Sequence, residues 1–239
     1  ARATSGSGEP SGDAIGARLM TALRREYGAP LQFAGVGGSH MMAGGLRSLF
    51  PMSDLAVMGF AELVPALPRL ALRLSQTVAA VHADGPAMVV GIDSKGFNLR
   101  VLRRLASARL RGALTTEAAA PALVQYVAPS AWAFADAPAR AAQLANSVPL
   151  DELLVLLPFE VPLYGSAGIQ CTFVGHPSME RELLGQGVAA RPPTSTSPAV
   201  VAPSTALCLL AGSRQVLKPL PPTSLLHRQP SSESIIGGS

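Results

Sequence analysis

Apolar runs of strand length alternate with helical patterns along most of this chain, and that alternation limits the folds it can adopt. The run AMVVGIDS (87–94) is apolar until its polar end, which is typical of a strand covered on both faces. A helical pattern follows over 98–110. Strands separated by helices predict βαβ units, and therefore an α/β fold with a mostly parallel sheet. The other predicted strands are 31–38, 123–130, 152–158, 171–177 and 205–214.

The stretch SGSGEPSGDAIGARLM (5–20) is a glycine-rich turn that leads directly into an amphipathic helix over 12–27, with Ser11 placed to cap it. A turn of this kind binds anions or sugar hydroxyls through its backbone N–H groups. It normally follows a buried strand, because the rigid end of the strand fixes the orientation of the loop. Here only a polar leader, 1–7, precedes it, which fits either the remainder of a removed transit peptide or a fragment.

The composition suits a globular chain, since 48% of the 239 residues are apolar and 14% are charged. The net charge is +4, but only two of the 19 basic residues are lysines, and no basic run is interleaved with aromatics. Nucleic-acid binding is therefore disfavoured, and an anionic membrane surface or a phosphorylated substrate is the better match. No apolar stretch reaches the ~18 residues of a transmembrane helix. Cys171 and Cys208 match neither a disulfide framework nor a metal site.

The predicted strands should bring several candidate residues to one edge of the sheet, where ligands bind in open parallel sheets. Asp93 ends the strand 87–94 and is the best candidate for a general base, because a carboxylate at the end of a buried strand is partly desolvated. The alternative is that Asp93 caps the helix that follows. Trp132 could stack on a sugar or a lipid surface, or fill core, and for His176 a structural or lining role is favoured.

An apolar stripe runs along 61–81 at helical spacing, and a core-facing helix explains most of it. Pro65 and Pro68 are expected to break its first turn and to leave Leu63–Leu67 in a loop near the ligand-binding edge. Leucines in that place, with flanking arginines, predict reversible attachment to a membrane surface rather than a span.

Six motifs follow one another along residues 8–214: GEPSGD (8–13), FAGVGGSHMMAGGLRSLFPMSDLAVMGFAEL (33–63), VVGIDSKGFN (89–98), YVAPSAWAF (126–134), LLPFEVPLYGSAGIQCTFVGHP (156–177) and LLAGSR (209–214). As an ordered set they resemble the lipid-A-disaccharide synthase family, and the residues within the motifs are most like those of its plant members. The ordered set is highly specific, whereas no single motif would be.

This resemblance implies the amino-terminal half of a GT-B glycosyltransferase, in which two Rossmann-like domains face each other across a cleft. It implies transfer of 2,3-diacylglucosamine from UDP-2,3-diacylglucosamine to 2,3-diacylglucosamine 1-phosphate, giving a β-1,6-linked disaccharide 1-phosphate and UDP, without a metal or other cofactor. Asp93 would deprotonate the acceptor hydroxyl, a role worth roughly 10²–10⁴-fold. The other implied contacts are Glu9, Ser11 and Asn98 to substrate, Arg214 to the donor phosphates, and Leu63, Val64, Leu67, Leu70 and Leu74 to acyl chains at the membrane.

The resemblance also divides the chain. It implies a Rossmann-like acceptor-side domain over 8–186, a linker rich in proline and serine over 187–204, and the remnant of a donor-domain strand over 205–214. Residues 215–239 show no periodicity and are expected to be a disordered tail. Because the family's first strand and most of its second domain are missing from this pattern, we expect a chain shortened at both ends, with weak or no transferase activity alone.

Two smaller departures are AGSR in place of the family's PGSR, and Gln125 where the family has His. A non-catalytic lipid-binding remnant at a membrane surface stays open as the alternative function. A nicotinamide-dependent oxidoreductase is disfavoured, because GSGEPSG is not a clean G-x-G-x-x-G and no acidic residue ends a second strand. The resemblance implies a mitochondrial location for a plant protein and the cytoplasmic face of the inner membrane for a bacterial one. A homodimer stays open.

Overall fold

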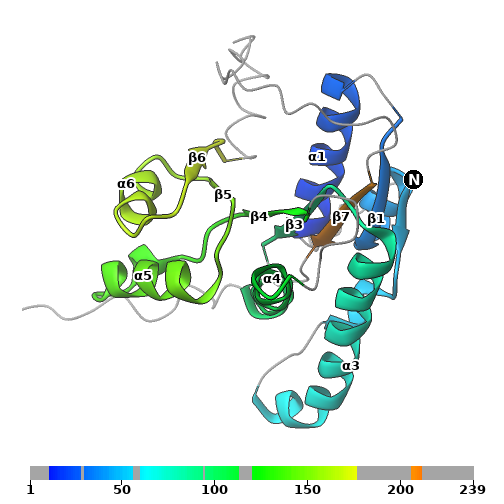
Figure 1. The fold of residues 1–239 in the computed structure, drawn as a ribbon, viewed down its shortest axis with the longest axis horizontal. Helices are drawn as coiled ribbons and strands as arrows, with labels where there is room; N and C mark the ends of the chain where they lie inside the picture. Colours follow the sequence, from blue (N-terminus) through cyan, green and yellow to red (C-terminus); the bar gives the residue numbers. More distant parts are fainter. Residues whose placement is uncertain are drawn as a thin grey trace, which may run out of the picture.

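The computed structural model describes residues 11–27, 30–55, 60–93, 95–112, 120–176 and 206–211. These residues form a seven-stranded parallel sheet in the order β2-β1-β7-β3-β4-β5-β6, flanked by helices (Figure 1). The strands are β1 (Gln32–Val36), β2 (Leu46–Ser48), β3 (Met88–Ile92), β4 (Ala122–Tyr126), β5 (Glu152–Val155), β6 (Cys171–Phe173) and β7 (Ala206–Ala211). The helices are α1 (Ser11–Tyr27), α2 (Ser39–Ala43), α3 (Phe60–Asp84), α4 (Lys95–Leu110), α5 (Ala137–Ser147) and α6 (Glu160–Gly165), with short 3₁₀ turns η1 (Met52–Leu55) and η2 (Ala131–Ala133).

The predicted α/β class and Rossmann-like parallel sheet are confirmed. Each of the six predicted strands overlaps an observed one, and the predicted helices at 12–27 and 98–110 correspond to α1 and α4. The sequence missed β2 and α2, whose three and five residues are too short to show a period. It also missed α5 and α6. The predicted linker and tail lie outside the described residues.

Two apolar cores lie on opposite faces of the sheet, because successive side chains of a strand point to opposite faces. In β3, Val89 belongs to the core under α3, α4 and α5, whereas Val90 and Ile92 belong to the core under α1. In β7, Leu210 joins the first core and Leu209 the second. These strands are therefore apolar at nearly every position, as the continuous runs in the sequence predicted.

Strand β7 lies in the interior of the sheet, between β1 and β3, although it is the last described segment of the chain (Figure 1). It pairs in parallel with both neighbours. Gly35 of β1 allows the close approach: its φ is +141°, and a Cβ there would stand 2.0 Å from the carbonyl oxygen of Leu209. Such a position suits glycine.

The placement of β7 corrects the expectation that 205–214 belongs to a donor-side domain. In the structure, Ala206–Ala211 is an inner strand of the same sheet as β1 and β3. The physical reason is that the facing edges of β1 and β3 each offer a row of backbone hydrogen-bonding groups, which a strand between them satisfies. The segment ALCLLA can bury apolar side chains on both faces at once.

Helix α3 runs from Phe60 to Asp84 with Pro65 and Pro68 inside it, so the prediction that these prolines leave Leu63–Leu67 in a loop is wrong. Both prolines are exposed and three residues apart, and so share one solvent-facing side of the helix. The carbonyl groups that lose their intrahelical partners there can bond to water instead.

Candidate active site

The carboxyl ends of the strands meet at one edge of the parallel sheet, called here the carboxyl edge. The loops that follow β1, β3, β4 and β5 begin there, with Gly37, Asp93, Val127 and Leu156 respectively. Of the candidates predicted from the sequence, Asp93 and Trp132 lie in these loops, and the parallel sheet brings the loops together. This edge is where an open parallel sheet binds its ligands.

Asp93 follows β3 directly and is buried, at 5% exposed. Its backbone adopts a left-handed conformation, with φ at +57°. The backbone N–H donates to the carbonyl oxygen of Tyr126 at 2.9 Å, and the backbone carbonyl accepts from the side-chain amide of Gln125 at 3.1 Å. A non-glycine residue held in this region by its neighbours is a recurring feature of functional sites.

Gln125 supports the loop ends beside Asp93. It is buried within β4, and its amide nitrogen lies 3.1–3.3 Å from the carbonyl oxygens of Asp93, Tyr126 and Val127. Val127 also has a positive φ, of 73°, which is unusual for a β-branched residue. Gly91 leaves the space for this side chain, since a Cβ at Gly91 would stand 2.5 Å from Gln125 Oε1. The sequence analysis noted Gln125 only as a departure from the family, although a polar residue inside the apolar run LVQYV was a signal of this role.

Asn98 is fully buried in the first turns of α4. Its side-chain amide donates to the carbonyl oxygens of Ile92, at 3.0 Å, and Leu210, at 2.9 Å. These bonds tie the carboxyl ends of β3 and β7 to the helix that follows Asp93. The side-chain oxygen of Asn98 is buried and has no hydrogen-bond partner among the described residues. The amide nitrogen therefore holds the two strand ends together. The side-chain oxygen is left able to accept a hydrogen bond from a group outside the described residues.

Asp13, in the first turn of α1, anchors the loop after β1. Its buried carboxylate accepts hydrogen bonds from the backbone N–H groups of Gly38, His40 and Met41 at 2.9–3.0 Å, and lies 3.0 Å from Nδ1 of His40. Nothing in the sequence links Asp13 to a loop 25 residues away.

Replacing Asp13 with alanine should destabilise the protein by about 3 kcal/mol, because three backbone N–H groups lose a charged acceptor. Urea denaturation followed by circular dichroism measures this. The matched control is Asp136→Ala: Asp136 pairs with Arg140 on an exposed helix start and should leave stability unchanged. Equal denaturation midpoints for the two variants would contradict the anchoring role.

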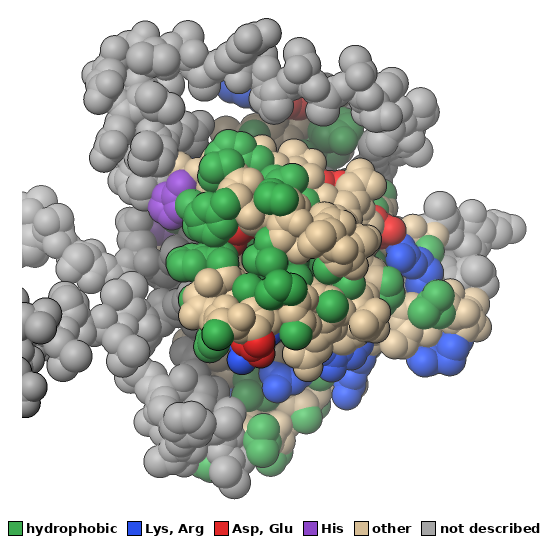
Figure 2. Space-filling model, turned by 90° about the vertical axis from the view of Figure 1, so that its left-hand side faces the viewer, with side chains coloured by type: hydrophobic (Ala, Val, Ile, Leu, Met, Phe, Trp, Pro, Cys, Tyr) green, Lys and Arg blue, Asp and Glu red, His purple; other side chains and the backbone are tan. Residues whose placement is uncertain are grey.

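Exposed aromatic and aliphatic side chains follow β4, β5 and β6 near the carboxyl edge. Trp132 is 46% exposed, so it does not simply fill core; its ring lies edge-to-face with Phe159, with centroids 5.7 Å apart. The indole N–H donates to the buried carboxylate of Glu160 at 3.1 Å, which fixes the ring. Figure 2 views this end of the molecule, with hydrophobic side chains gathered on it. The exposed side chains of this group are Trp132, Phe134, Phe159, Phe173 and Val174.

Only part of the predicted contact set is described. Glu9 and Arg214 lie outside the described residues, and for Ser11, Leu63 and Val64 only the helical backbone is described. The predicted acyl-chain stripe separates along α3: Leu67 is 52% exposed, Leu70 is half-buried, and Leu74 is buried in the core. None of the described helices is long and apolar enough to cross a membrane.

The comparison with known proteins places the chain in a family. Residues 6–217 match the family model described as lipid-A-disaccharide synthetase. The lipid-A-disaccharide synthase of Rhodospirillum centenum is 46% identical over 218 residues, which are 90% of this chain and 50% of that protein. The corresponding protein of Paramagnetospirillum magneticum is 40% identical over 209 residues, 87% of this chain and 49% of its own.

A plant relative is also similar. The Arabidopsis thaliana protein named "Probable lipid-A-disaccharide synthase, mitochondrial" is 43% identical over 174 residues, 73% of this chain and 37% of its own. The chain thus spans about half the length, or less, of these relatives. Because the family model covers most of the chain, including Asp13, Asp93 and Gln125, the chain belongs to the lipid-A-disaccharide synthase family.

Proposed function

We propose that this chain carries the acceptor side of a lipid-A-disaccharide synthase. The reaction would transfer 2,3-diacylglucosamine from UDP-2,3-diacylglucosamine to 2,3-diacylglucosamine 1-phosphate, and the products would be the β-1,6-linked disaccharide 1-phosphate and UDP. The observation that carries the proposal is the placement of Asp93: a buried carboxylate at the carboxyl edge, on a left-handed backbone held by β4.

Asp93 acts in this proposal as the general base. Its carboxylate takes the proton of the acceptor hydroxyl as that oxygen bonds to the anomeric carbon of the donor sugar. The bond from this carbon to the UDP oxygen breaks, its electron pair leaves with UDP, and the configuration at the carbon inverts. Positioned general bases contribute roughly 10²–10⁴-fold.

Gln125 and Asn98 act as positioning residues. Gln125 holds the carbonyl oxygen of Asp93, and Asn98 fixes the strand end that precedes it. By the family resemblance, Glu9 and Ser11 of the glycine-rich turn would position the substrate, together with Asn98. Arg214 would bind the donor phosphates, since a guanidinium binds phosphate oxygens in pairs.

The function is tested with two proteins. The 239-residue chain, given both substrates, should form little or no disaccharide. The acceptor side alone neither encloses the donor nor provides the positive charge that stabilises the leaving diphosphate. A chimera that joins residues 1–214 to the carboxyl-terminal half of the Rhodospirillum centenum synthase should form it, measured by mass spectrometry. Robust synthesis by the chain alone would overturn the first expectation. An inactive but folded chimera that binds UDP would overturn the proposed function.

A non-catalytic lipid-binding role is the second candidate, and the exposed leucines of α3 favour it. Leu67 and Leu72 are both more than half exposed, and Arg69, one helical turn before Leu72, is also exposed. We expect this surface to bind reversibly to anionic vesicles. Co-sedimentation should fall when both leucines are changed to serine and should persist in an Arg111→Ser control on another helix end. If sedimentation with the vesicles does not depend on the two leucines, this surface is excluded as the membrane-binding site.

A further inference from the structure

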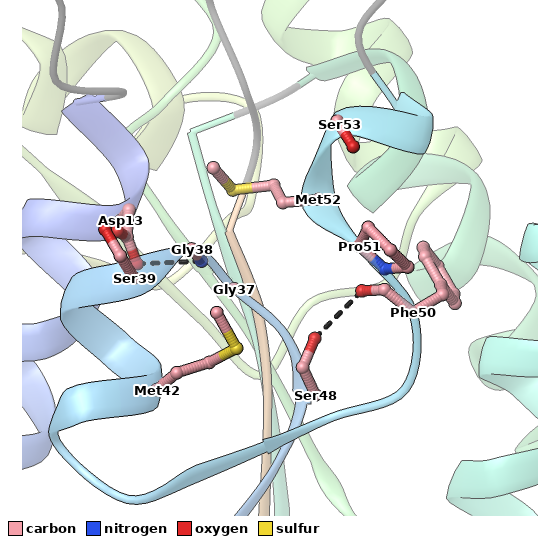
Figure 3. A pocket seen from close by; sticks show the side chains of 10 residues that line it. All are labelled: Asp13, Gly37, Gly38, Ser39, Met42, Ser48, Phe50, Pro51, Met52 and Ser53. Atoms are coloured by element: carbon pink, nitrogen blue, oxygen red, sulfur yellow. Dashed lines mark hydrogen bonds between the residues drawn. The ribbon is translucent and has the colours of Figure 1, made fainter.

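A cavity of about 510 Å³ lies beside the carboxyl end of β1, between α2 and η1 (Figure 3). Its volume falls within the range of about 300–1,000 Å³ that is common for small-molecule sites. It is lined by Asp13, Gly37, Gly38, Ser39, Met42, Ser48, Phe50, Pro51, Met52 and Ser53. None of these residues belongs to the stripe of leucines predicted to hold acyl chains.

Glycines keep the sheet side of the cavity open. A Cβ at Gly38 would stand 2.5 Å from Asp13 Oδ2 and 3.0 Å from the terminal methyl of Met52. A Cβ at Gly37 would stand 2.5 Å from a methyl of Leu46. On the opposite side Phe50 forms a fixed wall, because the Arg73 guanidinium packs over its ring at 4.7 Å. The cavity is therefore largely preformed.

The chemistry of the described lining disfavours an anion and favours an apolar ligand. Among the described lining residues the only charged one is Asp13, a carboxylate, which would repel a phosphate. Its oxygens are already bound by backbone N–H groups, and the Ser48 hydroxyl donates to the carbonyl oxygen of Phe50 at 2.9 Å. The other described side chains of the lining are two methionines, a phenylalanine, a proline and two further serines.

Two methionines face the cavity from opposite sides (Figure 3). Met42 comes from α2 and is 49% exposed, and Met52 comes from η1. Unbranched thioether side chains adapt to flexible apolar ligands, and an exposed methionine gains free energy when a ligand covers it. This pair is suited to a narrow, unbranched chain.

The position of the cavity connects it with Asp93. Strand β1 is separated from β3 only by β7, so the two strand ends lie about 10 Å apart along the carboxyl edge. A sugar held at Asp93 could therefore extend a hydrocarbon substituent across the end of β7. We propose that this cavity binds one acyl chain of the lipid-sugar substrate. This assignment rests on the proposed function.

The test measures affinity as a function of chain length. Calorimetry would compare glucosamine 1-phosphate carrying octanoyl, decanoyl or dodecanoyl chains, using the 239-residue chain. Affinity should rise about fourfold for each methylene until the cavity is full. In Met42→Trp, and independently in Ser53→Trp, the indole fills the cavity, so this rise should disappear. Both positions are partly or fully exposed, so the folded state should tolerate the change.

The matched control is Leu110→Trp at the exposed end of α4, which should keep the full chain-length dependence. If the rise survives in Met42→Trp and Ser53→Trp, or is also lost in Leu110→Trp, the cavity assignment is overturned while the proposed function stands. A fluorescent fatty acid without a sugar tests whether the cavity binds a free hydrocarbon chain and not the lipid-sugar substrate. If it binds and both cavity variants block it, but the sugar phosphates do not bind at all, the assignment to the substrate is overturned together with the proposed function.

Discussion

Asp93→Asn in the chimeric enzyme should lower kcat by roughly 10²–10⁴-fold, the usual contribution of a general base. Asparagine has the same shape as aspartate and is also among the residues that tolerate a left-handed backbone, so φ at +57° should be kept. Because only the proton acceptor is lost, affinity for the acceptor lipid should change little. A fall in kcat with unchanged acceptor binding is the pattern of an interaction that acts in the transition state.

The control for this prediction is Asp136→Asn, which removes an exposed carboxylate paired only with Arg140 and should not alter kcat. Rates are measured by single-turnover assays, and acceptor binding by calorimetry on the same preparations. If Asp93→Asn keeps more than about a tenth of the wild-type rate, proton abstraction by Asp93 is ruled out. If both rate and melting temperature collapse, the residue is structural.

Leu209→Asp in β7 should unfold most of the protein at room temperature. Leu209 is fully buried between β1 and β3, and an aspartate there would be a charge without a partner. Changes of this type cost more than about 4 kcal/mol, against a typical total stability of 5–15 kcal/mol. The matched control is Leu110→Asp at the end of α4, where the side chain is 80% exposed and the melting temperature should hardly move.

Alkylation of Cys208 reports directly on β7. Burial raises the pKa of this thiol to about 12 in the folded protein, whereas an unfolded thiol has a pKa of about 8.5. In a Cys171→Ser background, the wild-type thiol should therefore stay protonated and slow to react as the pH rises through about 8.5 to 10. In Leu209→Asp the rate should climb through about pH 8.5. Equal alkylation rates in the two proteins would mean that β7 does not depend on Leu209.

The sequence predicted those parts of the fold that rest on local patterns. A continuous apolar run identified β3 as a buried strand, and the alternation with helices identified the parallel sheet. The partner strands of β7 could not be predicted, because pairing depends on which edges are open in the assembled sheet and not on the strand itself. The helical course of α3 through its two prolines could not be predicted. The free-energy cost of a proline inside a helix depends on whether the carbonyl groups that lose their partners face water.

At the candidate site, the residues that could be predicted are those that directly follow a predicted strand, because the end of a strand marks the ligand-binding edge. Asp93 could be placed at the mouth of the sheet in this way. Asp13 could not, because its partners Gly38, His40 and Met41 lie in a loop that is distant in sequence. The cavity was also not predicted: its lining comes from α1, the β1–α2 loop, α2, β2 and η1, and no periodicity in the sequence joins such segments.

The order of the strands has a consequence for biosynthesis. The middle of the sheet is completed by β7, the last of the described strands along the chain, so β1 and β3 are translated long before the segment that joins them. Until then each exposes a backbone edge and apolar side chains, which are the features that make nascent chains aggregate. Such distant pairing also slows folding. Production of this protein should therefore depend strongly on chaperones that shield unfinished chains.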